Sequence, residues 1–153
     1  MIAKAIELNA GHKCKFIVLK SDNLAIFSND SFDLIYCYVV LQHLPARHFI
    51  ESTISEFVRV LKPGGLGAFQ LLSFVPLKYR LQPTRRLYQF FRSLGFSHNF
   101  LYRTLRLTPI RQNYIPEHRV LRLLEGLGAA SLETQRSTIE ESSVESSVYF
   151  FSK

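Results

Sequence analysis

The residue best suited to take part in a reaction is His43, which follows a nearly continuous apolar run at 32–40 (FDLIYCYVV). Such a run is typical of a strand covered on both faces by helices. Ligands of open α/β sheets bind beyond the carboxyl ends of strands, and an imidazole titrates near neutral pH. His43 is therefore a candidate general base. A histidine that merely hydrogen-bonds at a helix start would give the same pattern, so both interpretations stay open.

Other polar residues that could bind a ligand or catalyse a reaction lie next to predicted strands. The pair Asp22-Asn23 follows the apolar run at 15–19 (KFIVL), although Asp and Asn are also ordinary turn residues. Asp33 lies at the start of the run at 32–40, away from the end where ligands bind, and we expect a structural role for it. Lys62-Pro63-Gly64-Gly65 is interpreted as a structural turn, because proline cannot continue a helix and glycine permits positive φ.

Neither the histidines nor the cysteines have the spacing of a metal site. His12, His48, His98 and His118 show no mutual spacing that suits a metal ion, so no metal site is predicted. The two cysteines are interpreted as buried, reduced thiols because both lie in apolar runs. With no signal peptide at the N-terminus, this favours a cytoplasmic location.

The elements that must position these residues follow from periodicity. Apolar positions 50, 54, 57, 58 and 61 form one stripe of a helix from about 47 to 61. This helix separates the strand at 32–40 from another at 66–73, and a strand–helix–strand unit of this kind implies parallel strands in an α/β sheet. The other predicted elements are helices at 2–9, 84–94, 98–107 and 116–124 and strands at 15–19, 131–139 and 144–152, the last two forming a hairpin.

Charge is unevenly distributed along the 153 residues. The net charge is +7, yet no Asp or Glu occurs between Phe57 and Pro116, a stretch with ten Lys and Arg residues. Within it, residues 74–113 break the strand–helix rhythm and are interpreted as a basic, aromatic helical insertion or lid in a single domain at 1–153. Such asymmetry indicates an anionic partner.

Two strings of the sequence together resemble class I S-adenosylmethionine (SAM)-dependent methyltransferases, of the methyltransferase type 11 kind. They are NDSFDLIYCYVVLQHLP and EFVRVLKPGG, and the family has the same motifs at the same spacing. The C-terminal segment, from EHRVLRLLEGLG to SSVYFFSK, is similar to the family's last helix and closing antiparallel hairpin. The resemblance implies a Rossmann-like α/β fold, and it is loose only over 74–113.

The resemblance also implies a cofactor, SAM, and residues that bind it. In the family, an Asp at the position of Asp22 accepts a hydrogen bond from the adenine amino group, and the following backbone N–H meets a ring nitrogen. Asn23 and Leu24 therefore join Asp22 as candidate cofactor-binding residues, and Gln42 joins them from the end of the next strand. His43 would be the base for methyl transfer to a small-molecule acceptor.

The sequence departs from the family at its most characteristic motif. It contains neither the Gly-rich turn E/D-x-G-x-G-x-G nor the acid that binds the ribose hydroxyls. The fold is therefore expected to be N-terminally truncated and the chain by itself inactive. An exposed strand edge would then lead to self-association, or to pairing with a separately encoded N-terminal half. The alternative function is a non-catalytic module that binds an anionic partner through the insertion; nucleic acid and a membrane surface are the less favoured partners.

Overall fold

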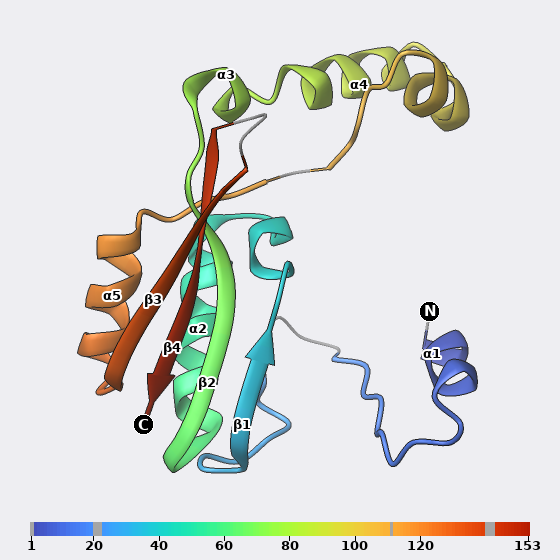
Figure 1. Cartoon of the computed structure of the whole chain (residues 1–153). Coiled ribbons are helices and arrows are strands. Elements are labelled where there is room, and N and C mark those ends of the chain that lie inside the picture. The colour runs from blue at the N-terminus through green and yellow to red at the C-terminus, as the bar shows by residue number, and fades with distance from the viewer. Residues whose placement is uncertain (1, 20–22, 111, 140–142) are drawn as a thin grey trace.

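The protein is described by a computed structural model that places residues 2–19, 23–110, 112–139 and 143–153 (Figure 1). Its centre is a four-stranded sheet in the order β1-β2-β4-β3. β1 (Phe32–Cys37) and β2 (Leu61–Phe74) are parallel, whereas β4 (Val144–Ser152) runs antiparallel to both β2 and β3 (Ala130–Ile139). The mixed α/β fold and its C-terminal antiparallel hairpin confirm the predicted fold class.

The parallel pair is joined by α2 (Arg47–Val60), as the apolar stripe predicts. Ile50, Ile54, Phe57 and Val58 are all buried on the face that α2 turns toward the sheet. The helix ends where β2 begins, since the Leu61 N–H donates to the Phe57 carbonyl and Leu61 is already paired with Phe32. The predicted strand at 66–73 thus begins five residues earlier than expected.

The core lies on one face of the sheet. α2 and α5 (Glu117–Gly126) contribute Ile54, Phe57 and Leu124, which pack against the aromatic side chains of Phe69 and Tyr149. Figure 1 shows both helices on this side and no helix across the opposite face. On that opposite face Leu34, Tyr36, Leu66 and Phe150 remain exposed.

One predicted strand is absent. Residues 15–19 have no regular secondary structure and all are exposed, so the expectation of a strand there was wrong. The side chains of residues 15–19 do not pack on the core. Among the described residues, β1 makes its ladder hydrogen bonds with β2 alone. Without a neighbour to satisfy its backbone groups, an apolar run of strand length does not become a strand.

Element ends differ where the backbone is unusual. β1 stops at Cys37 instead of continuing to residue 40, because Val39 adopts a left-handed φ of 58° that no strand accommodates. α1 spans Ile2–Leu8, close to the prediction. The helix expected at 98–107 is a short π-helix, η2 (Phe100–Thr104), rather than a full α-helix.

The described residues of 74–113 form an arm above the carboxyl ends of β1 and β2 (Figure 1). The arm holds α3 (Leu77–Arg80), α4 (Pro83–Ser93) and η2, and its aromatic rings pack mainly on one another, as between Phe91 and Phe96 at 5.5 Å. Among the residues that the structure places, no helix is both long and apolar enough to cross a membrane.

Candidate functional site

A cavity of about 310 Å³ lies between Leu19, Asn23 and Leu24 on one side and the end of β1 and the inner face of α2 on the other. Its size is at the lower end of the range for small-molecule pockets. The lining is mostly apolar, with Asn23, Thr53 and Glu56 as its polar residues; the apolar ones are Leu19, Leu24, Cys37, Val40, Leu41, Leu44 and Phe57. Burial raises the pKa of the Cys37 thiol, which disfavours its nucleophilic thiolate form.

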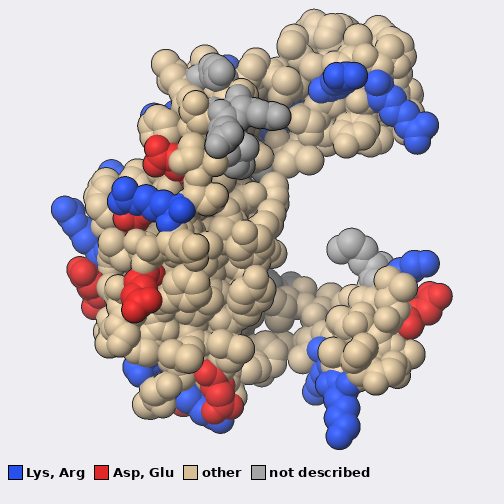
Figure 2. Space-filling view, in the orientation of Figure 1, with Lys and Arg blue, Asp and Glu red and all other residues tan. Residues whose placement is uncertain are grey.

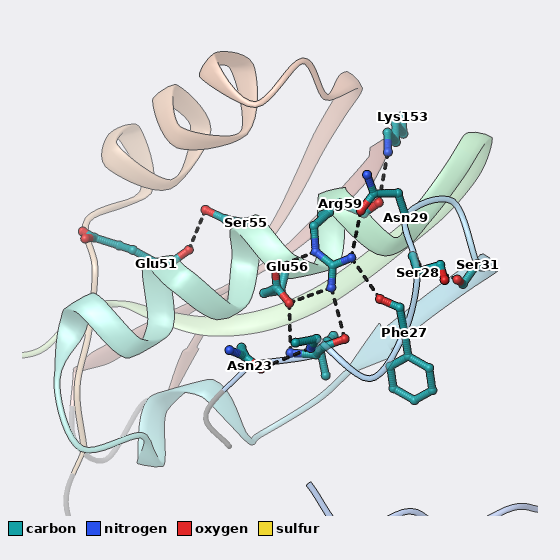
Figure 3. Close-up of polar contacts among 12 residues, drawn as sticks. Asn23, Phe27, Ser28, Asn29, Ser31, Glu51, Ser55, Glu56, Arg59 and Lys153 are labelled. Carbon is teal, nitrogen blue, oxygen red and sulfur yellow. Dashed lines mark hydrogen bonds and ion pairs between the residues drawn. The ribbon is translucent and has the colours of Figure 1, made fainter. Parts of the chain in front are cut away.

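The loop that carries Asn23 and Leu24 is fixed by two charged residues of α2 (Figure 3). The Leu24 N–H donates to Glu56 Oε2 at 2.9 Å, and Arg59 donates to both carboxylate oxygens at 2.7 and 2.8 Å. Arg59 also donates to the carbonyl oxygens of Leu24 and Phe27, at 3.1 and 3.0 Å. One ion pair therefore holds one wall of the cavity against α2.

The far end of the same loop is held by the C-terminal residue. Lys153 Nζ donates to Asp30 at 2.7 Å and to the Arg59 carbonyl at 3.2 Å. Arg59 itself donates to Asn29 Oδ1 at 2.9 Å. The chain therefore closes around the C-terminal end of α2, bringing together residues more than 90 positions apart.

The carboxyl end of β1 turns sharply toward the next helix. Val39 has positive φ, which is a rare conformation for a β-branched residue, and its N–H donates to the buried Gln70 side chain at 3.2 Å. Strained backbone of this kind occurs preferentially at ligand sites. The turn leads directly into η1 (Leu41–His43), which contains the predicted residues Gln42 and His43.

The structure places Gln42 and His43 in different surroundings. Gln42 is buried beside the cavity, and its Oε1 has no hydrogen-bond partner among the described residues. His43 is exposed at the end of η1. Asn113 anchors this turn to the base of the arm: its N–H donates to the Gln42 carbonyl at 2.8 Å and its side chain to the Leu44 carbonyl at 2.5 Å.

The predicted cofactor-binding residues are brought together only in part. Asn23 and Leu24 line the cavity, whereas Asp22 lies outside the described residues. Asp33 pairs with Lys62 across β1 and β2 at 2.8 Å, and this hydrogen bond lowers the pKa of the Asp33 carboxyl. In the described part of the chain, no three His, Cys, Asp or Glu residues are grouped as a metal site would require.

Sequence reasoning missed Glu56 and Arg59. Their i, i+3 spacing on a helix is the signal that could have indicated an ion pair. The spacing could not show that the pair also binds the backbone of Leu24. Glu56 accepts from the Leu24 N–H, 32 residues away, and Arg59 donates to the Leu24 carbonyl, 35 residues away.

We expect acid to open the loop at 23–31. Hydrogen bonds from Arg59, and then the Leu24 N–H, lower the pKa of Glu56. A carboxylate with a lowered folded-state pKa stabilises the fold above its unfolded-state pKa, and this contribution is lost as the pH falls through the folded-state value. Below about pH 4.5 the Leu24 amide should therefore exchange its hydrogen faster.

Glu56→Gln should remove this pH dependence, whereas Glu125→Gln, a matched change on α5, should keep it. Hydrogen exchange between about pH 3 and 6, corrected for intrinsic rates, is the measurement. An identical pH dependence of Leu24 exchange in the wild type and in Glu56→Gln would show that this carboxylate does not hold the loop.

Comparison with known proteins gives one family and several solved structures. Residues 1–69 match the family described as "Methyltransferase domain". No curated protein matches the chain. A SAM-dependent methyltransferase from Methanosarcina mazei is 18% identical, with a TM-score of 0.57 over 92% of this chain and 68% of its own.

Two further structures have the same fold. The 1,6-didemethyltoxoflavin-N1-methyltransferase of Burkholderia thailandensis is 12% identical, with a TM-score of 0.59 over 99% of this chain and 56% of its own. A "possible exported protein" from Bordetella parapertussis is 19% identical, with a TM-score of 0.60 over 99% of this chain and 49% of its own. This chain thus spans about half the length of these two structures. Residues 1–69 thus match the methyltransferase-domain family, and the chain as a whole has a Rossmann-like fold similar to that of SAM-dependent methyltransferases.

Proposed function

We propose that this chain is part of a SAM-dependent methyltransferase that acts on a small-molecule acceptor. The observation that carries the proposal is the cavity at the carboxyl end of β1, because it joins the family's adenine-contacting loop to the turn that carries His43. Among the similar structures, the Burkholderia enzyme is described as bound to 1,6-didemethyltoxoflavin and S-adenosylhomocysteine, which supports an acceptor of small size.

The residues present fit one end of the cofactor and not the other. A mostly apolar cavity of about 310 Å³ suits a flat heteroaromatic ring such as adenine. The sequence has no Gly-rich turn for close backbone approach to the rest of the cofactor and no ribose-binding acid in the family's place. In addition, the Leu24 N–H is already bonded to Glu56. We therefore assign Asn23 and the side chain of Leu24, not the Leu24 N–H, to the adenine end alone.

His43 is the proposed general base. SAM supplies an electrophilic methyl group, and an acceptor O–H or N–H must lose its proton during the transfer. His43 is exposed at the end of η1, between Leu41 and Leu44, which line the cavity, and an acceptor can reach it there. Once an acceptor is known, full activity of a His43→Gln variant would remove this residue from the role.

The arm at 74–113 is proposed as a lid over the acceptor. It leaves the sheet at the end of β2, and Asn113 at its other end is hydrogen-bonded to the turn at 42–44, next to the candidate site. In the alternative function, the arm binds an anionic partner without methyl transfer, and the ten Lys and Arg residues between Phe57 and Pro116 support this alternative.

We expect S-adenosylhomocysteine to bind this 153-residue chain weakly, with a Kd above roughly 100 μM, and through its adenine. Saturation-transfer NMR should show stronger saturation of the adenine protons than of the homocysteine protons, because only the adenine end has a cavity. Leu44→Trp, which fills the cavity, should abolish the signal.

Leu87→Trp, an exposed position on α4, is the matched control and should leave the signal unchanged. Equal saturation along the whole ligand, or an adenine signal that survives Leu44→Trp, would place the cofactor elsewhere and contradict the proposed site.

A further inference from the structure

A second hollow, of about 370 Å³, lies where the arm meets the start of α2. Four arginines line it: Arg47 from α2, Arg80 from α3, and Arg85 and Arg86 from α4. Among the residues that the structure describes, no carboxylate lines the hollow and none lies within ion-pair distance of these four side chains. Like charges gathered without a counter-ion repel one another, so this arrangement costs free energy unless an anion occupies it.

The helix N-termini at the hollow also favour a bound anion. α2 and α4 both begin there, through Ala46 and Gln82, and neither has an acidic residue in its first turn or a side-chain cap. A helix N-terminus carries a partial positive charge that favours anions and disfavours cations. Both helices nevertheless carry arginine in the first turn. The backbone dipoles and the side chains therefore all favour one negative ligand in the same place.

Two of the four arginines are held in place by neighbouring groups. Arg47 and Arg80 each lie 4.8 Å from the centre of the Tyr114 ring, and Arg80 Nε donates to the Val75 carbonyl at 2.6 Å. Cation–π contacts of this kind hold guanidinium groups with few rotamers. Three of the four side chains are exposed, so a ligand can reach their remaining donors.

The visible side of the arm shows no acidic residue that would compensate these charges. The visible face of the arm in Figure 2 carries Lys and Arg and no Asp or Glu, whereas both signs mix over the sheet and its helices. This agrees with the absence of acids between Phe57 and Pro116 in the sequence.

We propose that this hollow binds a phosphate monoester group, which is the anionic part of the methyl acceptor. Several guanidinium forks match the oxygens of a phosphate dianion better than those of a single carboxylate. Pro45, Ala46 and Asn113 line the hollow, and Asn113 is bonded to the turn that holds His43. A phosphorylated small molecule bound here would therefore extend toward the proposed base. The acceptor assignment rests on the proposed function, whereas the anion site itself does not.

The test is a calorimetric titration of the 153-residue chain with inorganic phosphate, at constant ionic strength set with sodium chloride and without SAM. We expect saturable binding, and about tenfold weaker binding in each of Arg47→Gln and Arg86→Gln, because each removes charge-assisted hydrogen bonds. Arg103→Gln, the same charge change on η2 away from the hollow, is the matched control and should bind as the wild type does.

Thermal unfolding keeps the test informative if a variant is unstable. Arg47→Gln removes a cation from a helix N-terminus, so in phosphate-free buffer it should unfold at the same or a higher temperature than the wild type. Phosphate should raise the unfolding temperature of the wild type and of Arg103→Gln, and raise that of Arg47→Gln far less.

Further titrations identify the kind of molecule that carries the phosphate. Glycerol 3-phosphate should bind at least as tightly as inorganic phosphate, whereas acetate should not compete. Equal loss of binding in all three arginine variants would mean diffuse charge attraction and would overturn the site. Binding only to phosphatidic acid vesicles or to a single-stranded oligonucleotide, and not to free phosphate, would assign the arm to a surface or to nucleic acid instead. Failure of phosphate binding would leave the adenine-saturation result untouched, so the two proposals fail separately.

Discussion

The 153-residue chain should self-associate through β1. β1 is an edge strand whose only ladder partner among the described residues is β2, and its side chains Leu34 and Tyr36 are 64% and 68% exposed. The other edge strand, β3, is protected by polar and charged residues such as Glu133 and Arg136. Unprotected edges pair with other strands because their N–H and C=O groups have no partner.

Sedimentation velocity at several concentrations is the measurement, with mass rising between about 1 and 100 μM. Tyr36→Lys should shift the chain toward monomer, since a lysine on an edge opposes strand pairing. Leu94→Lys, at an exposed position of the arm, is the matched control and should not do so. A stable monomer at the highest concentration would show that another part of the chain covers this edge. A separately encoded N-terminal half is the other partner expected for this edge from the sequence. A strand from such a partner should compete with self-association.

Replacing Gly67 with valine should abolish the folded state. Gly67 is paired with Phe151 across β2 and β4, and a Cβ at this glycine would overlap three carbon atoms of the Phe151 ring. Phe151 is 2% exposed and packs edge-on against Phe69, so a shift of its ring would disturb the packing of the core. Overpacking a core by a single methyl group costs about 1–3 kcal/mol, in a domain of roughly 5–15 kcal/mol total stability.

Gly67→Ala should therefore lower the free energy of unfolding by about 3 kcal/mol, and the larger valine should leave no cooperative transition in a urea titration followed by circular dichroism. Gly126→Ala is the control. It ends α5 at a position without positive φ and with open space around it, so alanine should stabilise the fold by about 0.5 kcal/mol. A fully stable Gly67→Val would mean that the Phe151 ring does not lie over this glycine.

Much of the fold was determined by the sequence itself. The stripe Ile50–Ile54–Phe57 has the period of a helix, and the nearly continuous apolar run that begins at residue 32 has the length of a strand. The hairpin at 130–152 has a polar turn between two strand patterns. The family strings also lie where the structure has β1, α2 and β2. These are local properties, so the neighbouring residues suffice to indicate them.

Tertiary structure alone decided what depends on distant partners. Residues 15–19 have a strand pattern but no neighbouring strand, and therefore remain irregular. The cavity depends on Glu56 and Arg59 bonding to a loop more than 25 residues away, and the arginine hollow gathers side chains from three helices. Residue spacing predicts which groups share one helix face or one strand end, but which faces meet follows only from the packing of the whole chain.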